Sequence, residues 1–132
     1  MPGNRPHADE SREAALAAAR AAASKQAERI AILDVRGLIV ITDYFLICSG
    51  QTERQVRTIV EEVEKSLRQL DRRPVRREGE TESRWVLLDY VDVVVHVFAE
   101  EEREYYDLER LWLDAPRVEL DAPGQAAAGS LD

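Results

Sequence analysis

The sequence predicts an α/β (α+β) fold in which helices pack on a single mixed β-sheet of about five strands. Residues 84–99 hold two runs of β-branched and aromatic residues with a polar break between them, which is the pattern of a β-hairpin. Alanine-rich or helically spaced segments separate the strand-like runs, in the order helix, strands, helix, three strands, helix. With 132 residues, 45% of them hydrophobic, the chain is long enough for one domain with a real core and too short for two.

The N-terminal part is predicted to form one helix and then buried strands. Residues 1–10 are polar and contain two prolines, so we expect them to be flexible. From residue 11 to about residue 28, alanine alternates with charged and polar residues, a composition of high helix propensity. Short apolar runs then occupy residues 30–35, 38–41 and 44–48, and they fit two buried strands as well as three.

A second helix is predicted to begin at a capping box, Thr52-Glu53-Arg54-Gln55, in which two side chains accept hydrogen bonds from backbone N–H groups. Pro74 ends this helix, which we expect to run to about residue 70. A short polar strand follows at residues 75–80, where Gly79 permits a sharp bend. The apolar residues that place one stripe of the helix on the sheet are Val56, Ile59, Val60, Val63, Leu67 and Leu70.

The predicted hairpin presents two different faces. A two-residue turn at Tyr90-Val91 would pair Asp89 with Asp92, Leu87 with Val94, and Trp85 with His96. The ordinary core face then consists of Val86, Leu88, Tyr90, Val93, Val95 and Val97. The opposite face consists of Trp85, Leu87, Asp89, Asp92, Val94, His96 and Phe98. This second face is too apolar to lie in water, so we expect one of the chain's own helices or another protein to cover it.

The last predicted helix begins at the acidic run 100–102, where negative charge favours a helix N-terminus, and it ends before Pro116. Residues 117–132 are mostly small and contain Ala, Gly and Pro, and we expect a disordered tail there. The predicted domain therefore spans residues 11–116. The core-facing residues of this helix are predicted to be Tyr105, Leu108, Leu111 and Trp112, while Arg103 and Tyr106 are predicted to help hold it to the sheet.

Charge and composition narrow the possible partners. The net charge of −8 argues against unaided nucleic-acid binding and favours basic partners. The one basic cluster, at residues 72–77, is followed at once by glutamates, so a solvated face is favoured over an RNA contact. The lone Cys48 lies in an apolar run, which predicts an unreactive thiol in a reducing compartment. No apolar run approaches the roughly 20 residues of a membrane helix, and we expect a cytoplasmic protein.

An enzymatic alternative uses the carboxylates. Asp89 and Asp92, with Asp43 and His96, are candidates for a metal site of the kind that transfers nucleotidyl groups, because such sites need carboxylates that converge on shared ions. Aspartates beside a hairpin turn more often cap its backbone, so this interpretation is disfavoured. A Cys48 nucleophile with a His96 base is less favoured still. The sequence has neither a glycine-rich phosphate loop nor a Cys/His ligand cluster, and no cofactor or metal is predicted.

Six ordered motifs resemble the ribosomal silencing factor family, also called Iojap-like proteins, over about residues 14–118. They are Asp34-Val35-Arg36-Gly37, residues 41–50, Glu78-Gly79, residues 85–90, residues 94–98 and residues 103–112. The resemblance implies a nucleotidyltransferase-like fold without enzymatic activity. It also implies binding to the fourteenth large-subunit ribosomal protein, which would stop the small subunit from docking and so repress translation.

The resemblance also implies roles for individual residues. One departure from the family pattern is Val91, where the family usually has glycine, so the type of turn is an open question. Besides the non-enzymatic repressor, a metal-dependent nucleotidyltransferase and a homodimer formed through the Trp85 face remain as hypotheses. Partner-binding roles are implied for Trp85, Leu87, Asp89, His96 and Phe98, with Asp43 and Tyr44 as their neighbours.

Overall fold

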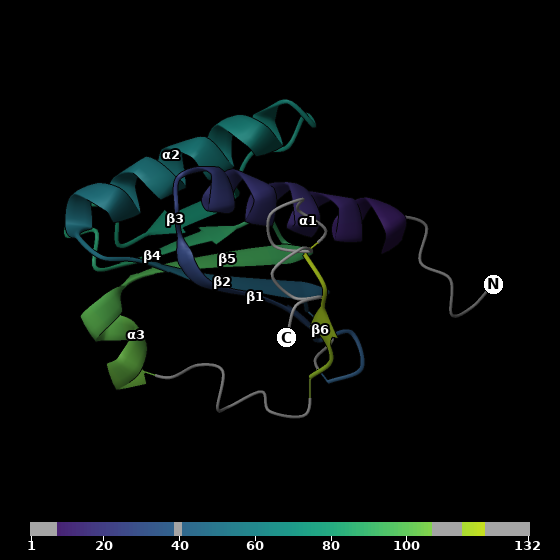
Figure 1. Ribbon diagram of the computed structural model, residues 1–132. Helices are drawn as coiled ribbons and strands as arrows, with labels where there is room; N and C mark the ends of the chain where they lie inside the picture. Colours follow the sequence, from purple (N-terminus) through teal and green to yellow (C-terminus); the bar gives the residue numbers. More distant parts are fainter. Residues whose placement is uncertain (1–7, 39–40, 107–114, 121–132) are drawn as a thin grey trace.

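The computed structural model describes residues 8–38, 41–106 and 115–120. Within them the helices are α1 (Ala8–Ser24), α2 (Glu53–Arg68) and α3 (Glu100–Tyr106). The strands are β1 (Glu28–Asp34), β2 (Tyr44–Gly50), β3 (Arg76–Glu78), β4 (Trp85–Asp89), β5 (Val93–Ala99) and β6 (Arg117–Val118) (Figure 1). The helix α1 begins three residues before the predicted start, so residues 8–10, which were expected to be flexible, are helical.

All six strands form one sheet in the order β3-β4-β5-β2-β1-β6. Because β2 and β5 are parallel and the other neighbours are antiparallel, the prediction of a mixed sheet is confirmed. The sheet has one strand more than expected. This strand, β6, pairs with β1 inside the predicted disordered tail, which corrects that prediction for its first residues, while residues 121–132 lie outside the described part.

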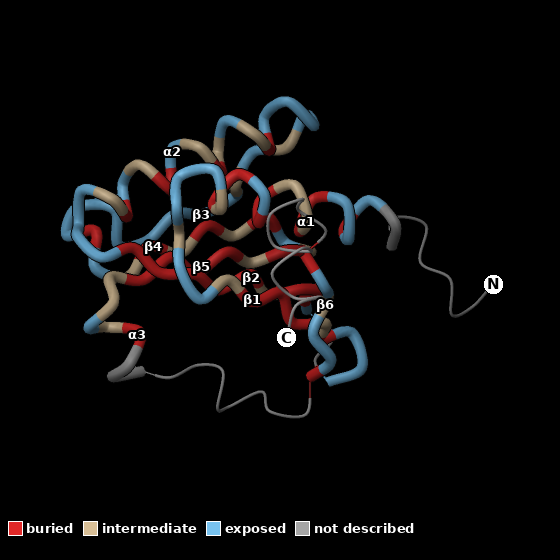
Figure 2. The backbone as a smooth tube through the Cα atoms, in the orientation of Figure 1, coloured by how far each residue is buried: buried red, intermediate tan, exposed pale blue. Residues whose placement is uncertain are grey.

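The helices α1 and α2 lie side by side over one face of the sheet (Figures 1 and 2). The side of α1 that faces α2 and the sheet is made largely of alanines, which are at most 7% exposed. Their small side chains allow α1 to approach both closely. The stripe predicted for α2 is buried apart from its last member, since the helix ends at Arg68 and leaves Leu70 44% exposed. The main core therefore lies between these two helices and the strands.

The start of α2 joins the two helices as well as capping one of them. The Thr52 hydroxyl accepts a hydrogen bond from the Gln55 N–H at 3.1 Å, as the capping box predicts. The Gln55 side chain accepts from the Gln51 N–H at 2.7 Å and donates to the carbonyls of Lys25 and Gln26, which follow α1. This one amide thus holds the end of α1 against the start of α2.

Two strands, β1 and β2, account for the apolar region before α2. The intervening run predicted at residues 38–41 is described only at its ends, where Leu38 is 47% exposed in a turn and Ile41 is 79% exposed. This connection between β1 and β2 contains apolar residues, and for that reason the sequence pattern fitted three strands as well as two.

The β4–β5 hairpin keeps the two predicted faces, apart from Asp92 in the turn, but not the predicted register. The observed pairs are Asp89 with Val94, Leu87 with His96, and Trp85 with Phe98, a shift of two residues. The turn consists of Val91-Asp92, one position later than predicted. A shift of two preserves which side chains share a strand face, because side chains alternate with a period of two.

The hairpin turn forces a valine into the left-handed region. Val91 has φ of +78°, and its N–H donates to Asp89 Oδ1 at 2.8 Å. A β-branched residue is strained at such an angle, and glycine is the residue that turns of this kind prefer. The Val91 side chain is 57% exposed, so it contributes little apolar burial in compensation.

Replacing Val91 by glycine should therefore raise the free energy of unfolding by about 1 kcal/mol, because the relief of strain exceeds the added entropy of the unfolded chain. Urea denaturation would measure the change. Val91→Ala serves as the control, since alanine keeps most of the strain and should gain much less. Equal or lower stability of Val91→Gly would show that the turn carries no strain.

Candidate functional site

Four rings lie on the face of the sheet opposite α1 and α2, and we call them the aromatic face: Phe45 on β2, Trp85 on β4, and His96 and Phe98 on β5. Phe98 is 1% exposed and His96 is 7% exposed, whereas Phe45 and Trp85 are half-buried. Leu87, Val94 and Asp89 stand beside the rings on the same strands and are also half-buried. The aromatic face thus has a buried floor and a partly open rim.

The rings hold each other in fixed positions. Trp85 Nε1 donates a hydrogen bond to His96 Nδ1 at 3.1 Å. The indole of Trp85 stacks on Phe98 with 4.9 Å between ring centroids, and the Phe45 ring meets the imidazole nearly edge-on at 5.5 Å. These are the offset and edge-to-face arrangements that aromatic pairs favour. Three adjacent strands therefore contribute to one rigid cluster.

His96 is a neutral, hydrogen-bonded histidine. Burial lowers its pKa to about 4, so the imidazole is uncharged at neutral pH. Since Nδ1 accepts from Trp85, the proton of the neutral ring lies on Nε2. This geometry is that of an interior histidine whose Nδ1 has a hydrogen-bond partner, and it favours that role over a catalytic base.

The lowered pKa of His96 predicts a loss of stability on mild acidification. The unfolded chain takes up this proton near pH 6.5, whereas the folded protein takes it up only near pH 4. The stabilisation is therefore complete above pH 7 and falls as the pH drops, by about 2 kcal/mol at pH 5. Urea midpoints measured from pH 8 to pH 5 would show it. The same slope in a His96→Asn variant would assign the effect to other groups.

Asp43 and Tyr44 do not adjoin the aromatic face, which corrects their predicted position. Tyr44 is 1% exposed and packs in the core under the helices. Asp43 is 4% exposed, and its Oδ2 accepts a hydrogen bond from the hydroxyl of Ser11 on α1 at 3.0 Å. Both side chains point to the side of the sheet that α1 and α2 cover. Their role in binding the partner therefore has no support from the aromatic face and stays a prediction.

Ser11 and Asp43 belong to a polar network that also holds Asp92 and Arg72. Ser11 Oγ lies 2.6 Å from Asp92 Oδ2, and Arg72 donates to both oxygens of Asp92 at 2.8 Å. Burial alone would raise the pKa of Asp92, but the hydrogen bonds from Arg72 and Ser11 outweigh it and lower the pKa. Asp92 was expected on the Trp85 face, and the left-handed Val91 turns it to the other side instead.

The four side chains proposed for a metal site are not gathered at one point: Asp43 and Asp92 meet through Ser11, whereas Asp89 and His96 lie apart from them. Asp89 accepts from its own turn and lies 3.5 Å from Arg76, while Asp92 binds Arg72 and Ser11. Among the described residues, no group of three or more His, Cys, Asp and Glu side chains is placed to hold a metal ion. Aspartate as a turn cap, the simpler interpretation, explains Asp89.

Cys48 is not placed to act as a nucleophile. Its thiol is fully buried on the helix-covered side of β2, and burial raises its pKa to about 12. His96 lies on the other face of the sheet, so the two side chains do not meet. The predicted unreactive thiol fits this environment.

The basic cluster is neutralised by nearby acids. Arg72 pairs with Asp92, and Arg77 pairs with Glu64 and Glu80. Arg73 pairs with Asp71. Arg76 pairs with both Glu78 and Asp89. This pattern favours the solvated face over an RNA contact.

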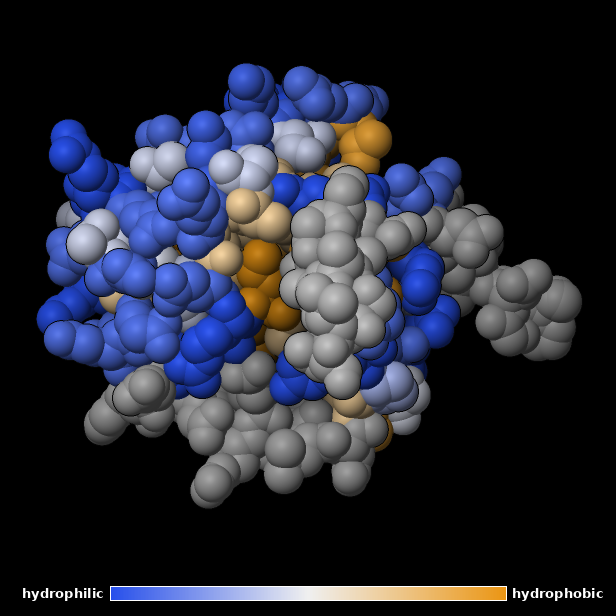
Figure 3. Space-filling model, in the orientation of Figure 1, coloured by the Kyte–Doolittle hydropathy of each residue, from blue (hydrophilic) through white to orange (hydrophobic). Residues whose placement is uncertain are grey.

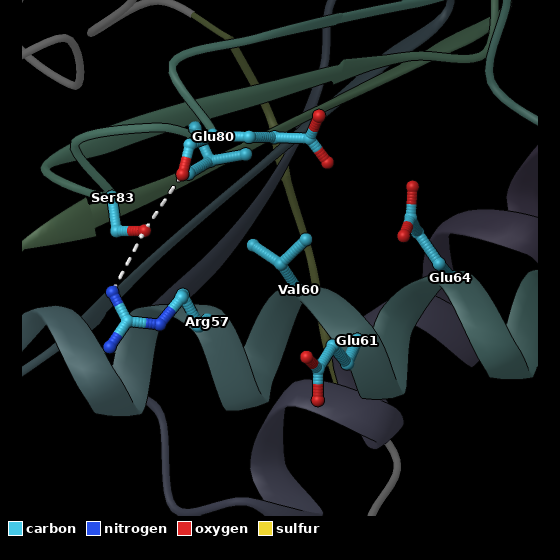
Figure 4. A pocket seen from close by; sticks show the side chains of 7 residues that line it. Arg57, Val60, Glu61, Glu64, Glu80 and Ser83 are labelled. Atoms are coloured by element: carbon cyan, nitrogen blue, oxygen red, sulfur yellow. Dashed lines mark hydrogen bonds between the residues drawn. The ribbon is translucent and has the colours of Figure 1, made fainter.

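A hollow of about 250 Å³ opens between α2 and the loop before β4 (Figure 4). The Arg57 guanidinium bridges it, with Nη1 3.5 Å from the Ser83 hydroxyl, and the carboxylates of Glu61, Glu64 and Glu80 surround it. Val60 and Val86 also line it, and both belong to the core on the helix-covered side of the sheet. The hollow therefore lies on the opposite side of the sheet from the aromatic face and does not extend that surface.

Arg103 anchors α3 to the sheet. Its side chain is 2% exposed, and Nη1 donates to the carbonyl of Arg29 at 2.6 Å and to Ser49 Oγ at 3.0 Å. Arg29 in turn donates to Glu100 at 2.8 Å. The predicted role of Arg103 in holding the last helix is confirmed, whereas the side chains predicted to help it at positions 105, 106, 108, 111 and 112 lie outside the described part.

The sequence interpretation missed Phe45 as a member of the aromatic face. The strand alternation of residues 44–48 gave the necessary signal, since Phe45 and Ile47 share one face and Tyr44, Leu46 and Cys48 the other. Only the pairing of β2 with β5, which is long-range, shows that Phe45 lies beside His96.

None of the helices in the described ranges combines the length and the apolar character needed to cross a membrane. Cytoplasmic location stays a prediction.

Comparisons with known proteins agree with the resemblance found in the sequence. A family model described as "Ribosomal silencing factor during starvation" matches residues 8–130. A ribosomal silencing factor of Halalkalibacterium halodurans is 47% identical over 104 residues, which cover 79% of this chain and 89% of that protein. The chloroplastic protein Iojap of Zea mays is 32% identical over 109 residues, covering 80% of this chain and 46% of that protein. A crystal structure from Bacillus halodurans, 43% identical, superposes with a TM-score of 0.73 over 83% of this chain and 99% of that one.

Proposed function

This chain belongs to the ribosomal silencing factor family, and from that membership we propose that it binds the fourteenth protein of the large ribosomal subunit. Its relatives support ribosome association and regulation of translation. In our proposal the bound protein occupies the face through which the large subunit joins the small one. The small subunit then cannot dock, and translation is repressed by steric exclusion.

The aromatic face is the observation that carries this proposal. Trp85, Phe45, Leu87 and Val94 form a half-buried apolar rim around a buried floor, on the side of the sheet away from α1 and α2. Large aromatic side chains with a fixed geometry are typical of the residues that dominate binding energy in protein interfaces. Asp89 at the edge of the rim adds a carboxylate for a basic partner.

Charge supports a basic protein partner. The chain carries 26 acidic and 18 basic residues, so its net charge repels RNA phosphates and attracts a basic ribosomal protein. Hydrophilic residues make up most of the described surface on the side drawn in Figure 3. Complementary charge accelerates association more than it raises affinity, and salt screens it. We therefore expect association with the large subunit to slow as salt rises.

The proposed activity requires no catalysis. The relatives are named as silencing factors, and the carboxylates Asp89 and Asp92 bind to different parts of this chain. Magnesium and nucleoside triphosphate titrated into the protein in a calorimeter test the alternative of a nucleotidyltransferase. Heat of binding at micromolar concentration would support the nucleotidyltransferase alternative.

The proposed function is tested with purified large and small subunits. The protein should sediment with large subunits and, at saturation, lower the fraction of joined ribosomes. Crosslinking on the large subunit should identify its fourteenth protein as the neighbour. Full joining at saturating protein would contradict steric exclusion. Light scattering at several protein concentrations tests the remaining alternative, a homodimer formed through the same face.

A further inference from the structure

We propose that His96 is a positioning residue for Trp85, and that its Nδ1 holds the indole in the one orientation that is ready for docking. This inference rests on the proposed function, because it concerns the surface that meets the ribosomal partner. It assigns His96 a role different from that of a contact residue. The imidazole is 7% exposed, so little of it is available to another protein.

The sheet register brings the two side chains together. Trp85 pairs with Phe98 and Leu87 pairs with His96, so Trp85 and His96 are diagonal neighbours on antiparallel strands. Long side chains reach each other across such a diagonal. The observed distance of 3.1 Å between Trp85 Nε1 and His96 Nδ1 is that of an ordinary N–H···N hydrogen bond.

The stack on Phe98 and the hydrogen bond to His96 constrain the indole in different ways. The Phe98 ring lies 4.9 Å from the indole with planes 27° apart, which fixes the plane of the Trp85 ring. A turn of about 180° about χ2 would carry the N–H to the opposite side of the Cβ–Cγ axis, and this torsion is broad and roughly two-fold. The acceptor at His96 Nδ1 distinguishes the two states, since only one of them makes the hydrogen bond.

The imidazole is itself held in place. Phe45 meets it edge-on at 84° from the neighbouring strand β2, and Phe98 lies parallel to it at 14°. The chain of contacts therefore runs from the buried floor to the half-buried Trp85. A side chain that is already ordered loses less conformational entropy on binding, so this arrangement favours tight docking.

Two substitutions separate positioning from packing. His96→Asn keeps an acceptor oxygen near the place of Nδ1, whereas His96→Leu fills a similar volume without an acceptor. We expect His96→Leu to fold, because leucine keeps the apolar packing of a buried position and the half-buried indole N–H can bind water in place of His96. Its affinity for purified large subunits should fall about tenfold, while His96→Asn should stay within about threefold of the wild-type protein.

A spectroscopic readout on the ¹⁵N-labelled protein without ribosomes accompanies the binding measurement. The chain has two tryptophans, and Trp85→Phe identifies which of the two indole N–H signals belongs to Trp85. That signal should shift and exchange faster with water in His96→Leu, and should remain protected in His96→Asn. A merely structural role predicts instead that affinity follows the thermal stability of the variants.

The outcomes are distinguishable. Wild-type affinity and a protected indole N–H in His96→Leu would overturn the positioning role alone. Equal loss of affinity in both variants would also overturn it, because the acceptor would then be irrelevant. Failure of the wild-type protein to bind large subunits would overturn the proposed function, and with it the purpose of the arrangement, even if the indole signal responds as expected.

Discussion

Replacing Trp85 by alanine is expected to lower the affinity for the large subunit by about 2–3 kcal/mol, or roughly 30- to 150-fold. Trp85 is the largest side chain of the aromatic rim, and Phe98 and His96 hold it rigidly. Truncation removes its contact area and leaves the acceptor on His96 without its donor. Co-sedimentation at graded protein concentrations measures the affinity, and the joining assay should show a matching loss of repression.

A matched control separates this effect from general loss of apolar surface. Leu70 is 44% exposed beyond the end of α2, on the side of the sheet away from the aromatic face. Leu70→Ala should bind large subunits as the wild-type protein does. Native affinity in Trp85→Ala, with an unchanged circular dichroism spectrum, would exclude Trp85 as an anchor.

Replacing Gly79 by alanine should destabilise the fold by about 3 kcal/mol, through a clash added to an unfavourable backbone angle. Gly79 has φ of +82°, and a Cβ at this position would lie 1.9 Å from the carbonyl oxygen of Trp85. The surrounding loop has little room to adjust, because the Gly79 carbonyl also accepts from the Ser83 N–H at 3.0 Å. The free energy of unfolding in urea measures the cost.

Gly37 provides the matched control for this substitution. A Cβ there would meet nothing within 4 Å, and the residue is not in the left-handed region. Gly37→Ala should therefore leave stability unchanged or raise it by up to about 1 kcal/mol, because alanine has fewer unfolded conformations. If the two variants were equally stable, the close approach of Gly79 to Trp85 would have no energetic weight. Because Gly79 contacts the first residue of β4, we also expect Gly79→Ala to weaken docking.

The sequence predicted which helices and strands form, and which side chains share a strand face, better than it predicted where the elements end and how the strands pair. Alternation along β4 and β5 identified the two faces correctly, because that pattern depends only on the chain's own periodicity. The register was wrong by two residues, since turn preferences disfavour Val91 at the position that it occupies. The two-residue strand β6 was missed because it is too short to show a period.

The candidate site was predictable in part. The mixture of aromatic and apolar residues along β4 and β5 was enough to predict an unusual sheet face, because strand alternation places these residues on one side. Asp43, in contrast, could not be placed from the sequence, because its Ser11 partner is 32 residues away. The buried site of Arg103 depends likewise on a carbonyl 74 residues earlier in the chain.

The network around Ser11 has a consequence for how the molecule opens. It joins the first turns of α1, the start of β2, the β4–β5 turn and the loop after α2 through Asp43, Asp92 and Arg72. Ser11 and Asp92 each contact two other members of the network, so releasing the segment of either one removes two of its links. The amide hydrogens of these segments should therefore exchange with solvent at a common rate, as one cooperative unit at that end of the sheet.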